Sequence, residues 1–114
     1  MTQEQKELLL KDLCGRLPYD VFVNINDIKC VLQPHDISDL IKCDTDIKPY
    51  LFPLSTMTKE QKKEYAHILV MCSNLANCQL LGMTVEDFFH KNHLDYRGLI
   101  PMGLANDATG LNIY

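Results

Sequence analysis

A stripe of apolar side chains recurs at helical spacing in the second half of the chain and sets the strongest limit on its fold. Thr58 and Gln61 form a capping-box pattern ahead of it, and lysines occupy the opposite face of the expected helix. The stripe contains Tyr65, Ile68, Leu69, Cys72, Leu75 and Ala76. Because a helix in a small domain gains most of its stability by burying such a face, we interpret the stripe as core rather than as a groove for a partner.

Two further helices are predicted from the signals at their ends. Thr2 and Gln5 repeat the capping-box pattern, Gly15 is placed as a C-terminal cap, and Pro18 forbids continuation of the helix. The apolar face of this N-terminal helix is expected on Leu10, Leu13, Cys14 and Leu17. Residues 84–93 carry the same start signal and predict a short third helix.

The segment between the first two helices has the pattern of β-structure. Residues 21–25 alternate, Asn26-Asp27 is a turn signal, and residues 28–32 form a second apolar run, which predicts an antiparallel hairpin. Residues 37–43 fit either a helical turn or a third strand, and the spacing does not decide between them. Residues 50–52 lie between two prolines and are expected to dock on the core as a short irregular segment.

Together these signals predict one α+β domain that spans residues 1–114, a usual size for a single domain. Its parts are an N-terminal helix, a small antiparallel sheet from Val21 to about Cys43 (a hairpin plus a possible third strand), and two C-terminal helices that help to cover one sheet face. The glycines and asparagines after about residue 105 predict a loose tail.

The charge of the chain argues against nucleic acid as a partner. The formal net charge is −4, so the chain lacks the positive footprint that phosphate backbones require. The acidic excess lies in one stretch, in Asp20, Asp27, Asp36, Asp39, Asp44 and Asp46. We interpret these aspartates as turn residues, with an acidic mimic of nucleic acid as the alternative if all six share one exposed face.

The cysteines and the N-terminus indicate the compartment. The chain has 5 cysteines, an odd number, and no pair has C-x-x-C spacing, so most are interpreted as small buried hydrophobes in a reducing cytosol. The polar start of the chain is not a signal peptide, and no apolar run reaches the roughly 20 residues that a membrane span requires. We therefore expect a cytoplasmic protein.

Two polar clusters are candidates for a site. Asp95, Tyr96 and Arg97, followed by Gly98, fit a type I turn, and Arg97 is available either to a partner's carboxylate or phosphate or to an acid of the domain itself. The second interpretation is favoured. His90 and His93 have a spacing that lets both reach one metal ion, but no third ligand completes a known pattern, so we favour two surface histidines at a helix end.

Three segments, taken in order, are distinctive: residues 8–19 (LLLKDLCGRLPY), 47–58 (IKPYLFPLSTMT) and 93–100 (HLDYRGLI). They resemble a family of small uncharacterised (hypothetical) proteins of Bacteroides-type gut bacteria and their phages or mobile elements. The chain departs from the family around Phe52, where an arginine followed by Pro-Met-Ser-Ser-Met is common, and after Ala105. The resemblance implies a bacterial or phage origin in the cytosol and no particular chemistry.

The sequence contains no catalytic or cofactor motif: no G-x-S-x-G, no glycine-rich phosphate loop and no H-E-x-x-H. The leading hypothesis is therefore a non-catalytic accessory or interaction protein with a protein partner, and the formation of a homo-oligomer stays open. The alternative is a small enzyme or ligand-binding domain that uses a cysteine or a histidine, which requires a pocket holding such a side chain beside a carboxylate. Residues for catalysis, cofactors or metals are not assigned.

Overall fold

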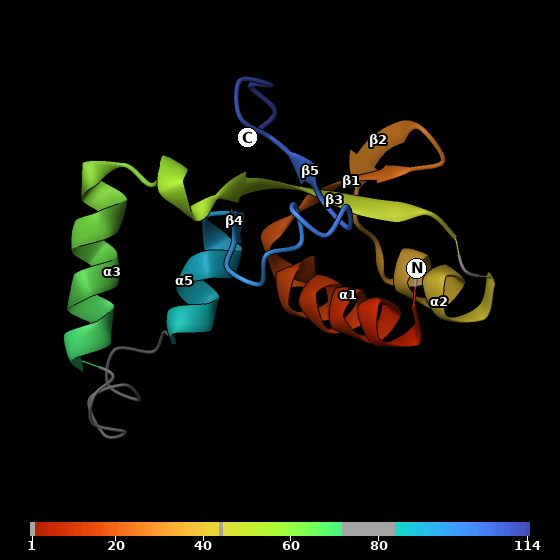
Figure 1. Cartoon of the computed structure of the whole chain (residues 1–114), viewed down its shortest axis with the longest axis horizontal. Helices are drawn as coiled ribbons and strands as arrows, with labels where there is room; N and C mark the ends of the chain where they lie inside the picture. Colours follow the sequence, from red (N-terminus) through yellow and green to blue (C-terminus); the bar gives the residue numbers. More distant parts are fainter. Residues whose placement is uncertain (1, 44, 72–83) are drawn as a thin grey trace.

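The computed structural model describes residues 2–43, 45–71 and 84–114. The elements are α1 (Gln3–Arg16), β1 (Phe22–Ile25), β2 (Ile28–Val31), α2 (Pro34–Cys43), β3 (Ile47–Pro53), α3 (Lys59–Met71), α5 (Val85–Lys91), β4 (Leu94–Asp95) and β5 (Asn106–Asp107), with 3-10 turns at Leu17–Tyr19 and Leu54–Thr56. Helices and a small sheet are combined, as in the predicted α+β class (Figure 1). No helix in this part of the chain is long and apolar enough to cross a bilayer.

The predicted helix starts are confirmed by reciprocal hydrogen bonds. At α1 the Gln5 amide donates to the Thr2 hydroxyl over 3.1 Å, and the Thr2 amide donates to the Gln5 side chain over 3.0 Å. The same box caps α3 through Thr58 and Gln61, and α5 through Thr84 and its aspartate three residues on. Each box satisfies two amide groups that the first helical turn leaves without partners.

The predicted end and apolar face of α1 are wrong in part. The helix continues through Gly15 to Arg16 before the 3-10 turn, so Gly15 does not cap it. Its buried side chains are Leu9, Asp12, Leu13 and Arg16, whereas Cys14 is exposed. The apolar pattern alone missed this face because two of its members are charged and pair with each other at i and i+4.

The hairpin is confirmed, and its turn type follows from the backbone. Asn26 and Asp27 have φ of 50° and 69°, so both central residues are left-handed, as in a type I′ turn. Asparagine and aspartate tolerate this region better than other non-glycine residues. Residues 37–43 belong to α2, which begins at Pro34, so the helical alternative holds there.

The third strand is β3, in the segment that the sequence predicted to be irregular. It pairs antiparallel with β1, and Asn26 N donates to Asp46 O over 3.3 Å. Hydrogen-bonded pairs alternate along an antiparallel ladder, so Pro49 falls in a pair that exchanges no hydrogen bonds, and its nitrogen points away from β1. A proline is tolerated there because the neighbouring strand needs no N–H at that position.

The second half of β3 pairs with β4 and β5, both parallel to it, so the sheet is mixed rather than antiparallel. Phe52 N donates to His93 O over 2.8 Å, and the nitrogen of the next residue, Pro53, therefore points away from β4. The parallel pairs join residues more than forty positions apart, which short-range patterns do not reveal.

Among the described residues, two clusters of buried side chains hold the elements together. The larger lies between α1, α2 and the sheet and contains Leu9, Leu13, Val21, Val23, Leu32, Leu40, Ile47, Leu51, Leu99, Leu104 and Ala105. The smaller joins α3 and α5 to β4 through Ile68, Phe88, Phe89 and Leu94. Figure 1 shows α3 and α5 side by side beyond the β4 end of the sheet.

The predicted stripe on α3 is buried only in part. Ile68 is buried and Tyr65 packs against the smaller cluster, but 46% of Leu69 is exposed. Cys72, Leu75 and Ala76 lie outside the described residues.

The C-terminal tail is docked rather than loose. Ala108 N donates to Leu51 O over 2.8 Å beside the β5 pairing. The Tyr114 hydroxyl donates to Tyr50 O over 2.7 Å and accepts from Phe22 N over 2.9 Å. The last residue of the chain is thus tied to two strands of the sheet.

Candidate functional site

The main group of polar side chains inside the fold is built around Asp12 of α1. Its Oδ2 lies 2.7 Å from Arg16 Nε, and its Oδ1 lies 3.1 Å from Arg97 Nε. The side chains of Asp12 and Arg16 are 0% exposed, and that of Arg97 is 14% exposed. One carboxylate therefore compensates two guanidinium groups, through the charge-assisted hydrogen bonds that such buried groups require.

Arg16 and Arg97 each make a second contact that fixes the chain after α5. Arg16 Nη2 donates to Leu94 O over 2.6 Å, which ties α1 to β4. The guanidinium of Arg97 lies over the Tyr96 ring, 4.7 Å from its centre, a cation–π geometry. Arg97 is thus paired with an acid of the domain, as the favoured interpretation of the 95–97 cluster expects.

Asp95 has a different role from the one predicted. Its carboxylate accepts from Leu99 N over 2.8 Å and from Ile100 N over 2.9 Å. The backbone bends at Arg97, and Gly98 has φ of 73°. The loop is closed by hydrogen bonds from backbone amides to the Asp95 side chain rather than by the predicted type I turn. Asp95, Tyr96 and Arg97 therefore shape and anchor this loop.

The two histidines are not surface residues on a helix end. His90 is 5% exposed and its Nε2 lies 2.9 Å from the Tyr96 hydroxyl. His93 stacks on Tyr114 with ring centres 3.7 Å apart, and its Nδ1 is buried without a hydrogen-bond partner. Among the described residues no group of three metal-ligating side chains forms, so the His90 and His93 pair is not completed there.

Burial lowers the pKa of both imidazoles, and the charge of Arg16 adds to the effect. For His93 the pKa falls to about 4. The unfolded chain then binds more protons than the folded chain between about pH 6.5 and pH 4. The contribution of His93 to the free energy of unfolding is therefore expected to be complete above about pH 6.5 and to be lost as the pH decreases toward about 4.

We expect a loss of about 1–2 kcal/mol between pH 7 and pH 4 from His93, a value lowered for the partial exposure of its ring. Urea unfolding across this range measures the loss. His93→Asn, which suits the positive φ of 56° at this position, is expected to flatten the pH dependence. His67→Asn, at an exposed histidine of α3, is the matched control and leaves it unchanged. An equal slope for His93→Asn and the wild type contradicts the assignment.

The cysteines in the described residues are not buried hydrophobes as predicted. Cys14 and Cys43 are exposed, and Cys30 is half-buried. Partial burial raises the pKa of the Cys30 thiol, and the charge of Asp36 acts in the same direction, so the reactive thiolate is disfavoured. Cys72 and Cys78 lie outside the described residues.

The acidic stretch does not present one common face. Asp36 is 7% exposed, and its carboxylate accepts from Gln33 N over 2.8 Å at the start of α2. Asp27 sits in the hairpin turn, as its interpretation as a turn residue expects. Asp44 lies outside the described residues. Since the nucleic-acid mimic requires all six aspartates on one exposed face, its condition is not met.

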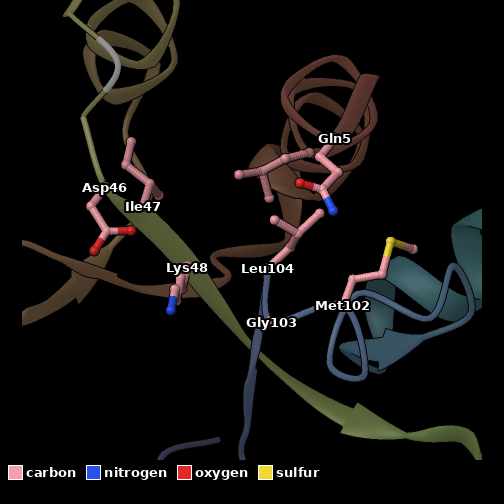
Figure 2. A pocket seen from close by; sticks show the side chains of 8 residues that line it. Gln5, Asp46, Ile47, Lys48, Met102, Gly103 and Leu104 are labelled. Atoms are coloured by element: carbon pink, nitrogen blue, oxygen red, sulfur yellow. The ribbon is translucent and has the colours of Figure 1, made fainter. Parts of the chain in front are cut away.

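Among the described residues, two surface pockets are well formed, and neither was predicted from the sequence. The larger, of about 280 Å³, is lined by Gln5, Leu9, Asp46, Ile47, Lys48, Met102, Gly103 and Leu104 (Figure 2). The smaller, of about 230 Å³, is lined by Phe52, Thr56, Thr58, Gln61, Leu94, Thr109 and Gly110. Their walls come from segments that are distant in the chain, so no local motif marks them.

Neither pocket has a thiol or an imidazole among its described lining residues. The larger offers an amide, a carboxylate and an ammonium group, and the smaller offers threonine hydroxyls. Comparison of the chain with protein-family models, with curated proteins and with solved structures finds no match.

Proposed function

We propose that the protein is a non-catalytic accessory or interaction protein that acts in the cytoplasm of a bacterium, as part of a phage or mobile element or of its host. The observation that carries the proposal is that the chemically versatile side chains inside the fold bind one another. Asp12 holds Arg16 and Arg97, and His90 pairs with Tyr96. None of these side chains lines either pocket.

The bacterial or phage origin is supported by the resemblance of residues 8–19, 47–58 and 93–100 to the small proteins of Bacteroides-type bacteria and their mobile elements. The alternative, an enzyme or ligand-binding domain with a cysteine or histidine site, calls for such a side chain in a pocket beside a carboxylate. In the described part of the chain the two pockets carry no such side chain, which favours the interaction protein.

The test uses the full chain in a Bacteroides-type host. The tagged chain is cross-linked in the cells and captured, and each recovered protein is then purified and titrated against the chain by calorimetry. We expect at least one saturable complex of fixed stoichiometry between the purified proteins.

Two results contradict the proposal. One is that no recovered protein reproduces its binding in purified form. The other is that the chain alone converts a small molecule of a host extract, followed by NMR, with a rate proportional to its concentration.

A further inference from the structure

The first half of β3 has backbone groups that β1 does not use. Because Asn26 N donates to Asp46 O just before β3, the next hydrogen-bonded pair along the ladder is Asn24 with Lys48. Ile47 lies opposite Ile25 in the intervening pair, so its N–H and C=O point away from β1. They face the opposite edge of β3, the edge along which β5 pairs further on.

The segment that pairs with this edge of β3 is β5, and its pairing does not extend as far as Ile47. The β5 pairing joins Tyr50 to Asn106, whereas the residues just before β5 bond elsewhere. Leu104 N donates to Leu99 O over 2.9 Å, and Gly103 N donates to Ile100 O over 3.0 Å. The space between this loop, β3 and α1 is the larger pocket (Figure 2).

Ile47 lines this pocket and is only 1% exposed. Within the part of the chain that the structure describes, no hydrogen bond satisfies its N–H or its C=O. Buried backbone groups without partners are rare because each loses its hydration on folding. A ligand that supplies one acceptor and one donor to Ile47 removes this penalty.

The rim of the pocket is polar and adaptable. The Gln5 amide oxygen accepts from Thr2 N over 3.0 Å, so its NH₂ group has remaining donor capacity. Figure 2 shows Gln5 and Met102 on the side of the pocket opposite Asp46, Ile47 and Lys48. Met102 is 42% exposed and unbranched. A change of its rotamer is therefore the simplest way to make the backbone of Ile47 accessible from the pocket.

An extended polypeptide is the ligand whose chemistry fits these groups. A single residue of a strand offers a donor and an acceptor on the same side, at the spacing of Ile47 N–H and C=O. Asp46 and Lys48 offer one charge of each sign to the flanking side chains. The pocket volume of about 280 Å³ lies just below the usual range for a small-molecule site, and it suits a short stretch of chain.

We propose that a short extended segment of a partner protein adds to the edge of β3 in this pocket, in line with β5, through backbone hydrogen bonds to Ile47. The segment lengthens the sheet by the β-augmentation that other domains use to bind peptides. The inference rests on the proposed function, because it names the place and the chemistry of the expected interaction.

The experiment titrates the full, ¹⁵N-labelled chain with an equimolar pool of acetylated, amidated pentapeptides of mixed sequence, followed by amide NMR. The Ile47 amide is expected to shift and to exchange more slowly with solvent, together with Gly103 and Leu104. A second pool, N-methylated at every peptide bond, lacks the backbone donors and is expected to leave the Ile47 signal unchanged.

Met102→Trp fills the mouth of the pocket and is expected to weaken binding by about tenfold or more. Met102→Ala keeps the mouth open and is expected to retain binding. Ile41→Trp places the same side chain at an exposed position of α2 outside the pocket, and serves as the control.

An Ile47 amide that does not respond to the unmethylated pool overturns the inference, because its polar groups are then satisfied by water. Equal binding of both pools overturns it as well. If a purified partner binds the wild type and Met102→Trp equally, the proposed function stands and this site is wrong. If no partner is found, the proposed function is wrong. The NMR response of Ile47 still shows in that case whether the pocket binds an extended peptide.

Discussion

Replacement of Asp12 by alanine is expected to lower the free energy of unfolding by about 3–5 kcal/mol, the largest effect of any single change considered for this chain. Asp12 compensates Arg16 at 2.7 Å and Arg97 at 3.1 Å, and the Arg16 side chain is 0% exposed. Without the carboxylate, Arg16 is a buried cation whose remaining hydrogen bond goes to a neutral carbonyl, that of Leu94. Urea unfolding at pH 7 measures the loss.

Lys11→Ala is the control for this change because Lys11 is the exposed neighbour on α1, and it is expected to alter stability by no more than about 0.5 kcal/mol. The double variant Asp12→Leu/Arg16→Met removes the buried pair but leaves Arg97, whose side chain is 14% exposed, without its acid. It is expected to recover part of the loss, because apolar side chains of similar volume often replace a buried ion pair at little cost. A loss for Asp12→Ala as small as that for Lys11→Ala shows that the pair does not stabilise the fold.

Gly15→Ala is expected to destabilise the protein by about 2 kcal/mol, although alanine favours a helix interior over glycine by about 1 kcal/mol. A Cβ at this position would clash with His90 Cε1. The His90 ring is 5% exposed and its Nε2 is held by the Tyr96 hydroxyl at 2.9 Å, so it does not move away easily. Thermal and urea unfolding of the variant measure the change.

The His90→Ala background separates the clash from other effects of the new methyl group. With the ring removed, Gly15→Ala is expected to stabilise the protein by helix propensity, so the sign of its effect reverses. The prediction is wrong if Gly15→Ala raises stability while His90 is present.

Features that depend on a few neighbouring residues were predictable. The threonine before each of α1, α3 and α5 accepts a hydrogen bond from the amide of the residue three positions later, so a short sequence pattern predicts where these helices start. The hairpin follows in the same way from an alternating run and an apolar run on the two sides of Asn26-Asp27. The pairing of Arg97 with an acid of the domain was also expected, but the identity of the acid was not.

The candidate site was not predictable in its geometry. Both pockets are lined by residues from distant segments, and the open edge of β3 depends on where the chain before β5 turns away. The exposure of Cys14 and the burial of His90 were missed because composition gives an average tendency for each residue type, whereas packing decides each position.

The N-terminal helix caps, the hairpin and the α+β class follow from the order of the amino acids, because these rest on hydrogen bonds and periodicities within a few residues. Long-range packing, in contrast, establishes that a strand with two prolines lies inside the sheet, and that two short strands lie parallel to it. It also decided that an aspartate and an arginine of α1 face inward. In each case a partner far along the chain makes the arrangement favourable, and for Asp12 and Arg16 these distant partners are Arg97 and the Leu94 carbonyl.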